Sequence, residues 1–557
     1  MVVKLNKIFI FTIFLYCGLG HCAPTPWLGE FDISYIKVEE VKEVKEVEGV
    51  NGPCLQVSSK LQLNDDGELF ITVPLGVNYF HVNSENLPKI EITNEPNVVK
   101  VSKSPNEMVD FSYQLCVVNE SNLIGGPILE SDFLHFKADK VLVLPENDNE
   151  EWRINIHFNG FSDDFNIISS LPSHNKEASH LGTLDNLKNS VFVGGTDLVQ
   201  EVFHVGKHPI RVAHKKGFQA LKQHLLTIQD IMTTQINFWN RFDFKNYLII
   251  LLEAPKGEDN INIGTHYYGA MTMQYPLEQK VSSKYYYWAL AHELEHGHTP
   301  LQPDYYFQEK DFNILWYMEG FNDYYGLLHA YQSGTISFNE YIEVFNDFIK
   351  AYYALPINDV SNKIIVEKYP KDLNYRLLSQ LRGHFFAKYL ACHMNSNNQD
   401  SFDIFMKGFL SKHKPHMGQA SYNEVIEKYF KQNLKSNLWH KYIEYIQDGT
   451  LFEFKDISFG PSVELVEAQV EVPTLCLDFL TLIEKKVIRN IDTQSNAYKA
   501  GLREGQEISH YQWSVFNPES RAIFWIKENE EIKTISFTTN KTVKTLPQFV
   551  IKDPNQV

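Results

Sequence analysis

The stretch from Tyr285 to His298, YYYWALAHELEHGH, decides how the rest of the chain is interpreted. Two serines precede it and a proline follows it closely, so both ends of a helix are marked. On that helix His292 and His296 lie one turn apart on the same face, where two imidazoles can bind one small ion. Glu293 lies beside them and can contact a water on that ion. Two His ligands with a carboxylate as general base are the arrangement of a zinc hydrolase.

A catalytic zinc site needs a third protein ligand and keeps its fourth position for water. The candidate is Glu319, in the middle of a second predicted helix that contains WYMEGFNDYY (316–325). Asp323 lies one turn further on the same face and can accept the other ring N–H of a ligand histidine, which fixes the tautomer of that histidine. The alternative, a solvated helix with two ordinary histidines, does not account for this second helix.

Three motifs carry a resemblance to a known family: H-E-x-x-H, W-x-x-E-G-F-x-x-Y-Y and GTISFNEY (334–341). They resemble the glycyl aminopeptidase family of zinc metallopeptidases, which are gluzincins related in their catalytic domain to thermolysin. The resemblance implies a Zn²⁺ cofactor held by His292, His296 and Glu319, with Glu293 as the general base, and a peptide or protein substrate. It also implies a multidomain α+β fold, with an N-terminal all-β domain, a thermolysin-like α/β plus helical catalytic domain, and a C-terminal PDZ-like domain.

Patterns along the chain give the expected domain boundaries. Short runs rich in β-branched residues come first, and helical spacing with one buried strand, YLIILLE, follows. Near the end, SNAYKAGLREGQEI resembles a run that is frequent in PDZ domains. The expected divisions are a signal peptide at 1–23, an N-terminal β domain at 24–175, the zinc metallopeptidase catalytic domain at 176–454 and the PDZ-like domain at 455–557.

The N-terminus has the composition of an export signal. A charged start, MVVKLNK, precedes the apolar run IFIFTIFLYCGLG and then HCAPTPW. The apolar run is too short to span a bilayer comfortably. We therefore expect cleavage near Cys22 and Ala23, no stable membrane anchor, and a secreted or periplasmic protein. A membrane anchor or a buried first strand is the alternative.

The net charge of the chain bears on the class of molecule that it binds. The net charge of −18 argues against nucleic acid as a partner, because a surface that follows phosphates needs clustered Lys and Arg.

Export of the protein would permit a disulfide bond between cysteines. Cys54 and Cys116 are the one pair considered, because they fall in the same predicted domain. The sequence leaves open whether these two cysteines are bonded. It also leaves open whether the protein forms a homo-oligomer.

Two departures from the family's motifs bear on specificity and rate, and the first concerns substrate binding. In gluzincins a strand with a GGLEH or GAMEN type of motif precedes the zinc helix and binds the substrate as an added strand. Its Glu receives the free amino terminus. Here Gly269 and Ala270 match, but Thr272 stands at the Glu position, where a hydroxyl cannot pair with an ammonium as a carboxylate does. An ordinary edge strand is the alternative.

The second departure concerns the oxyanion. The family has Tyr-x-x-Gly at the start of a later helix, where the Tyr donates a hydrogen bond to the oxyanion. Gly383 matches the glycine, but Gln380 occupies the Tyr position. Tyr375 lies nearby and could substitute only if the loop differs.

The sequence thus predicts an exported zinc peptidase with altered amine-recognition and oxyanion positions. Two alternatives stay open. One is an endopeptidase or another peptidase of altered specificity. The other is a catalytically weak or inactive zinc-fold protein that acts through protein contacts.

The predicted PDZ-like domain has one further departure. PDZ domains capture a peptide by strand addition, with a Gly-rich loop at the peptide carboxylate. The matching loop here is 476–479, where Asp478 replaces a glycine and would repel a carboxylate. A packing or assembly role is therefore preferred to peptide capture.

Overall fold

The structure is a computed structural model that describes residues 27–36, 54–74, 77–83, 89–92, 98–116, 127–130, 132–146, 151–218, 221–242, 244–253, 264–275, 283–298, 312–369, 372–394, 401–412, 422–513, 515, 521–528 and 531–552. The predicted signal peptide, 1–23, lies outside these residues. The chain divides into two compact units, Met1–Ser121 with Gly126–Thr196 and Asp197–Val557 with Asn122–Gly125.

The N-terminal unit is β-rich because its sequence alternates apolar and polar residues between turns. A seven-stranded sheet has the order β13-β14-β11-β1-β2-β7-β4, and two four-stranded sheets have the orders β10-β3-β6-β5 and β12-β15-β9-β8. The strands are β1 (Trp27–Ile36), β2 (Cys54–Gln62), β3 (Glu68–Thr72), β4 (Val77–Asn83), β5 (Lys89–Ile92), β6 (Val98–Ser102), β7 (Met108–Cys116), β8 (Ile128–Leu129), β9 (Phe133–Lys137), β10 (Leu144–Pro145), β11 (Glu151–Asn159), β12 (Asn166–Ser169), β13 (Ser173–His174), β14 (Glu177–Thr183) and β15 (Val191–Gly195).

A disulfide lies in the largest sheet of this unit. Cys54 begins β2 and is disulfide-bonded. The antiparallel register of β2 and β7 sets Cys54 directly opposite Cys116. This register agrees with the one pairing that the sequence suggested.

The N-terminal unit continues to Thr196, beyond the boundary predicted at residue 175. Strand β14 pairs with β11 and strand β15 pairs with β9, so both belong to the sheets of this unit. The onset of helical spacing suggested the earlier boundary, and such a local signal does not reveal strand pairing over long separations.

The second unit contains a five-stranded sheet in the order β16-β17-β18-β20-β19. Strand β18 is the predicted buried strand YLIILLE, with only its final Glu exposed. Strands β17, β18 and β20 run parallel, whereas β19 is antiparallel and lies at the edge. The strands are β16 (Leu198–Val205), β17 (His208–Lys215), β18 (Tyr247–Glu253), β19 (Gly264–Tyr267) and β20 (Ala270–Tyr275).

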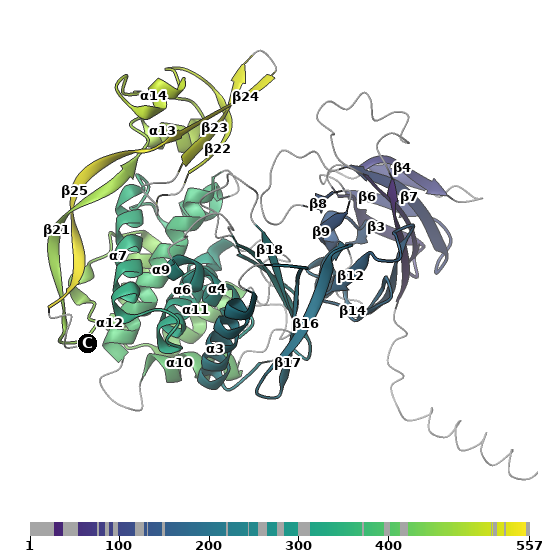
Figure 1. The fold of residues 1–557 in the computed structure, drawn as a ribbon, viewed down its shortest axis with the longest axis horizontal. Helices are drawn as coiled ribbons and strands as arrows, with labels where there is room; N and C mark the ends of the chain where they lie inside the picture. The colour runs from purple at the N-terminus through teal and green to yellow at the C-terminus, as the bar shows by residue number, and fades with distance from the viewer. Residues whose placement is uncertain are drawn as a thin grey trace, which may run out of the picture. The chain divides into compact units, whose positions relative to one another are not determined.

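The helices of this unit share one apolar core with the sheet, and α6 lies at its centre. Every residue of α6 from Leu315 to Leu327 is buried. Helices α6 and α9 cross closely at Gly320 and Gly383, since a Cβ at Gly383 would lie 1.7 Å from the carbonyl oxygen of Trp316. Figure 1 shows α4, α6, α7 and α9 gathered in this helical region. Small residues at the crossing fix the separation of the two helices.

Helix ends follow the sequence signals where these are local. The predicted capping box between Ser337 and Glu340 begins α7. The main helices are α3 (Leu221–Trp239), α4 (Ser283–Glu295), α6 (Leu315–Gln332), α7 (Phe338–Ala354), α8 (Asn362–Lys368), α9 (Leu373–Met394), α10 (Phe402–Lys412), α11 (Tyr422–Asn433) and α12 (Ser436–Tyr442).

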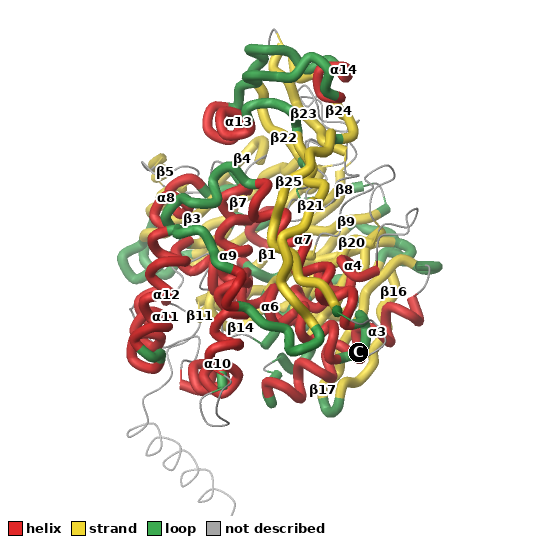
Figure 2. The backbone as a smooth tube through the Cα atoms, turned by 90° about the vertical axis from the view of Figure 1, so that its left-hand side faces the viewer, coloured by secondary structure: helices red, strands yellow, loops and turns green. Residues whose placement is uncertain are grey.

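The C-terminal region was predicted to be PDZ-like. It has a two-stranded ribbon of β21 and β25, a three-stranded sheet in the order β22-β23-β24, and two short helices. The ribbon lies along α7 (Figure 1, Figure 2). The rings of Phe345 on α7 and Phe549 on β25 are 5.6 Å apart. The elements are β21 (Val463–Thr474), α13 (Phe479–Lys485), α14 (Asn496–Ala500), β22 (Ile508–Gln512), β23 (Arg521–Glu528), β24 (Glu531–Thr538) and β25 (Asn540–Ile551).

The loop expected to meet a peptide carboxylate leads into a helix. Asp478 caps α13 by accepting a hydrogen bond from the backbone N–H of Thr481. The carboxylate predicted to repel a ligand therefore has a local structural role.

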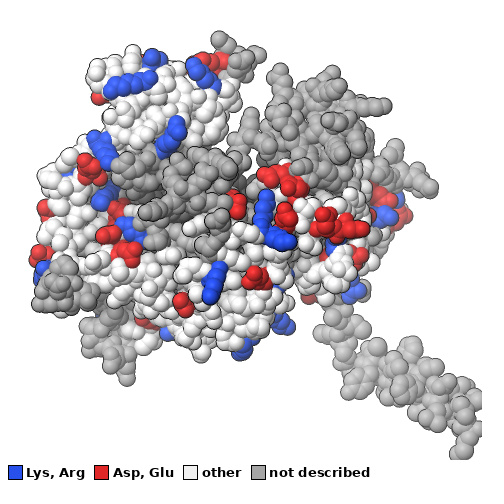
Figure 3. All heavy atoms as spheres, in the orientation of Figure 1, with Lys and Arg blue, Asp and Glu red and all other residues white. Residues whose placement is uncertain are grey.

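Two observations concern the surface. Of the helices that the structure describes, none is long and apolar enough to cross a membrane. On the face shown in Figure 3, the described Lys and Arg side chains lie scattered among Asp and Glu.

Candidate metal centre

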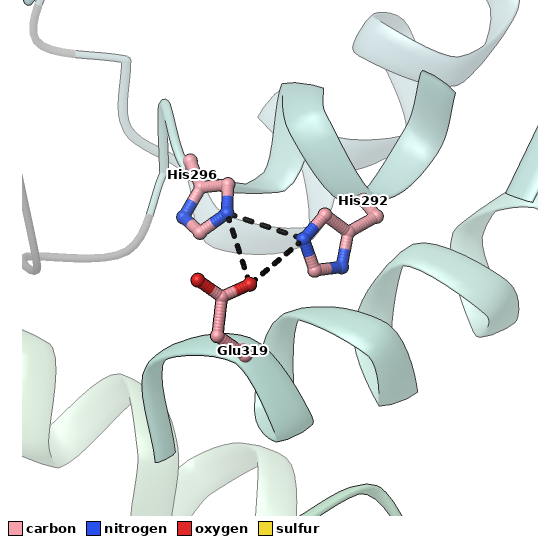
Figure 4. Close-up of side chains that lie close together, drawn as sticks. All are labelled: His292, His296 and Glu319. Carbon is pink, nitrogen blue, oxygen red and sulfur yellow. Dashed lines mark hydrogen bonds and ion pairs between the residues drawn. The ribbon is translucent and has the colours of Figure 1, made fainter. Parts of the chain in front are cut away.

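Three side chains of the second unit converge on one point. Nε2 of His292 and Nε2 of His296 lie 3.2 Å apart, and Oε2 of Glu319 lies 3.4 and 4.0 Å from them. Figure 4 shows the three side chains pointing toward one another, and all three are buried. Their ligand atoms lie within 4.8 Å of one another, which is a grouping that can hold a metal ion. The two predicted helices, α4 and α6, thus bring together the three residues predicted as ligands.

The buried carboxylate of Glu295 links α4 to helices α3 and α6. Glu295, the last residue of α4, accepts a hydrogen bond from Nε1 of Trp239 on α3 and lies 2.9 Å from Nδ1 of His329 on α6. Glu295 and His329 are fully buried. Gly326 of α6 packs against the backbone of His292, where a Cβ would lie only 2.8 Å away. These contacts fix the orientation of α4 relative to α6.

Each histidine of the pair has a partner for its other ring nitrogen. Nδ1 of His292 lies 2.7 Å from Oδ1 of Asp323, as the sequence predicted. Nδ2 of Asn322 lies 2.6 Å from Nδ1 of His296. The oxygen and nitrogen of an Asn amide exchange places when the group flips, and the flipped amide would accept a hydrogen bond from Nδ1–H, so that Nε2 keeps its lone pair for a metal. Both imidazoles can therefore face the centre with Nε2. Asn322 was not predicted as a site residue, although it directly precedes Asp323 in the sequence.

Glu293 lies beside the centre and against strand β19. A Cβ at Gly264 would lie 2.1 Å from Cγ of Glu293, so any other residue there would displace the Glu293 side chain. Burial raises the pKa of the Glu293 carboxyl to about 7. A carboxylate with a pKa near neutrality can both take and return a proton.

The structure corrects the predicted substrate strand. The run from Gly264 to Tyr275 forms a hairpin of β19 and β20, with a turn at Tyr268 and Gly269. Strand β20 lies between β18 and β19, so neither of its edges can accept an added strand. Ala270 and Thr272 are fully buried within it. Among the strands that the structure describes, β19 forms the edge of the sheet beside the metal centre.

Strand β19 also brings an unpredicted histidine to the centre. The ring of His266 lies 5.4 Å from the ring of His296, and Nδ1 of His266 lies 3.2 Å from the hydroxyl of Tyr247. Burial lowers the pKa of His266 to about 3, so its imidazole is neutral near pH 7. No pattern in the sequence marked His266, because its approach depends on the hairpin.

Helix α9 crosses α6 and carries the two residues predicted for the oxyanion position, Gln380 and Tyr375. The Gln380 side chain hydrogen-bonds the carboxylate of Asp323. Tyr375 is buried, and burial, followed by the carboxylates of Glu484, Asp372 and Glu367, raises its pKa. Its role as an oxyanion donor stays a prediction.

One residue of α9 that the sequence did not single out does reach the centre. Nη2 of Arg376 donates a hydrogen bond to Oε1 of Glu319 at 2.8 Å. Burial would raise the pKa of Glu319, but the Arg376 guanidinium, followed by His292, holds that pKa far below its usual range. Glu319 is therefore an anion.

Comparisons with known proteins bear on this centre. The model of the M61 glycyl aminopeptidase family matches residues 288–366. No curated protein matches the chain. Among solved structures, an aminopeptidase N family protein from Idiomarina loihiensis is similar over 95% of this chain and 99% of that chain, with a TM-score of 0.67 and 14% identity. An M1 zinc metallopeptidase from Deinococcus radiodurans is similar over 78% of this chain and 96% of that chain, with a TM-score of 0.50 and 13% identity.

These comparisons confirm the family resemblance and support a metallopeptidase. At such low identities the solved structures show a shared fold and nothing finer. The family match carries the chemical argument, because its range includes both histidines and Glu319.

Proposed function

We propose that this chain is an exported, zinc-dependent peptidase in which His292, His296 and Glu319 hold the ion. One observation carries the proposal: two imidazole nitrogens and one carboxylate oxygen converge, with the carboxylate of Glu293 beside them. Two imidazoles and one carboxylate are a donor set that catalytic zinc accepts in other hydrolases. Asp323 and Asn322 support it by holding the outer ring nitrogens.

The bound ion would supply Lewis acidity, which polarises a peptide carbonyl and acidifies a water. Glu293 would take the proton from the attacking water and pass it to the leaving amine. Gly264 keeps space for the Glu293 side chain against β19.

The substrate would bind as an added strand along the outer edge of β19, which is the edge strand of the sheet among the described residues. Strand addition uses main-chain hydrogen bonds, so it tolerates many side chains. The residues of β19 are Gly, Thr, His and Tyr, and none of them is acidic. We infer that this strand recognises the peptide main chain rather than a free amino terminus.

This inference predicts weak discrimination between free and acetylated amino termini. A charged hydrogen bond is worth roughly 1.5–3 kcal/mol, or about 10- to 150-fold in selectivity, and its loss should leave matched peptides within about 10-fold in kcat/KM. Cleavage of such pairs from a peptide library, followed by mass spectrometry, measures this ratio. A strict requirement for the free amine would mean that a carboxylate elsewhere binds it.

Export is part of the proposal and rests on the charged and apolar N-terminus. The disulfide at Cys54 supports it, because disulfides persist in oxidising compartments. A secreted or periplasmic location follows.

For the C-terminal region we propose a packing role on the catalytic helix α9. Nζ of Lys486 forms an ion pair with Asp372, whose side chain is only 3% exposed. The hydroxyl of Tyr511 donates to Asp372 at 2.9 Å, and the amide of Asn374 donates to that hydroxyl at 2.7 Å. A PDZ-like region bonded in this way would brace the first turn of α9.

Replacing Lys486 by Met should therefore destabilise the protein, because it leaves Asp372 buried without its ammonium partner. We expect a loss of about 1–3 kcal/mol in the free energy of unfolding, measured with denaturant. Lys485→Met is the matched control, since Lys485 is the exposed neighbour. Equal stability of the two variants would argue against a packing role of the C-terminal region on α9.

A second candidate is a weak or inactive zinc-fold binding protein. It is favoured by the lack of a hydroxyl at Gln380, whose amide bonds Asp323. Since a missing oxyanion donor costs about 10²–10³ in rate, slow turnover is expected rather than none. Cleavage of no peptide in a broad library by zinc-loaded protein would favour this candidate.

A further inference from the structure

The two oxygens of Glu319 have different partners. Oε2 faces the Nε2 atoms of His292 and His296 at 3.4 and 4.0 Å. Oε1 accepts the hydrogen bond from Nη2 of Arg376 at 2.8 Å. The Glu319 side chain is 7% exposed and that of Arg376 is 41% exposed. The guanidinium thus bonds the carboxylate oxygen that does not face the histidine pair.

Backbone packing fixes this approach. Arg376 lies on α9 and Glu319 lies on α6, and these helices cross where Gly320 meets Gly383. A Cβ at Gly320 would lie 2.5 Å from Cα of Gly383, so the two helices are in direct backbone contact. Arg376 is therefore presented to Glu319 by a rigid pair of helices rather than by a loop.

Carboxylates bind metal ions through one oxygen or through both. A catalytic zinc has three protein ligands and needs a fourth position for water or substrate. If Glu319 supplied both oxygens, the second would compete for that position. A guanidinium on Oε1 prevents this, because its charge-assisted hydrogen bond holds that oxygen away from the ion.

We propose that Arg376 is a positioning residue: it holds Oε1 of Glu319, so that the carboxylate offers only Oε2 to the metal and one coordination position stays open. This inference rests on the proposed zinc-peptidase function. It adds a residue that does not touch the reacting atoms but determines how a ligand is presented.

The test compares Arg376→Gln with Arg376→Lys. The Gln variant loses the positive charge and is shorter, so no charge-assisted hydrogen bond holds Oε1, and Glu319 can bind through both oxygens. We expect kcat to fall about 10- to 100-fold at saturating zinc, with little change in KM. The zinc dissociation constant, from chelator competition, should not rise. In cobalt-substituted protein, the visible absorption of the Gln variant should weaken, because a higher coordination number gives weaker bands.

The Lys variant keeps a positive charge and one donor for Oε1, so its kcat and cobalt spectrum should lie close to wild type. The matched control is Arg489→Gln. Arg489 is another half-exposed Arg paired with a Glu, 3.4 Å from Glu504 and in the C-terminal region. It should leave all three readouts unchanged.

Three results would overturn the proposal. An unchanged cobalt spectrum in Arg376→Gln would mean that Glu319 keeps its binding mode without the guanidinium. A loss of activity that excess zinc fully restores would mean that Arg376 only strengthens metal binding. A Lys variant as impaired as the Gln variant would mean that the bond to Oε1 is not what matters. The spectrum and the affinity need no turnover, so they remain informative even if wild type cleaves no peptide and the proposed function fails.

Discussion

Replacing Glu293 by Gln is expected to remove peptide hydrolysis while zinc stays bound. The amide keeps the size of the carboxylate beside β19, where Gly264 leaves space for it. It cannot take a proton from water, and loss of a general base costs about 10²- to 10⁴-fold. Because the wild-type enzyme is expected to be slow, a loss of this size would lower its rate of peptide hydrolysis to that of the uncatalysed reaction. Initial rates on the best library peptide and zinc content per chain, measured on the same sample, check both parts.

The matched control for this change is Glu444→Gln, which alters a Glu that is 45% exposed and paired with Lys441. Its rate should equal that of wild type. Glu293→Gln protein that retains most of the wild-type rate would show that another group accepts the proton.

Replacing Gly383 by Ala is expected to disrupt the catalytic unit. The added Cβ would lie 1.7 Å from the carbonyl oxygen of Trp316, which is a backbone atom and cannot rotate away. Overpacking a core costs typically 1–3 kcal/mol, and a backbone clash of this kind should cost about 3 kcal/mol or more. Because α6 carries Glu319, zinc affinity should fall together with stability. Thermal unfolding with and without added zinc measures both.

Ser379→Ala is the control on the same helix, since Ser379 is buried one turn away and the change adds no atom. Its melting temperature should lie close to wild type. A Gly383→Ala protein as stable as Ser379→Ala would mean that α6 and α9 do not pack as closely as described.

Much of the metal centre could be predicted from sequence because it depends on helical periodicity. His292 and His296 are one turn apart on α4, and Glu319 and Asp323 are one turn apart on α6. Local spacing fixes which side chains share a face. The sequence also predicted that α4 and α6 converge, because a catalytic zinc needs a third protein ligand beside the two histidines.

Residues whose roles depend on tertiary contacts were not predicted. Arg376 reaches Glu319 only because α9 crosses α6, and no spacing within α9 indicates this. His266 and Gly264 reach the centre only because the chain reverses at Gly269, whose φ is +65°. A run interpreted as one strand therefore became two, and Thr272 moved from the expected edge into the sheet interior.

The same reason explains the N-terminal boundary. Strands β14 and β15 pair with partners far earlier in the chain, so they extend the first unit to Thr196. Composition changes near residue 176, but pairing between distant strands decides which unit a segment joins.

Metal analysis of protein purified without chelator decides whether His292, His296 and Glu319 hold zinc. About one zinc per chain is expected in wild type and in Glu293→Gln, and almost none in the double variant His292→Ala/His296→Ala. The Glu293→Gln protein serves as the reference, because it changes the same helix without removing a ligand. Equal zinc in wild type and in the double histidine variant would contradict the claim that these two histidines, with Glu319, form the metal site.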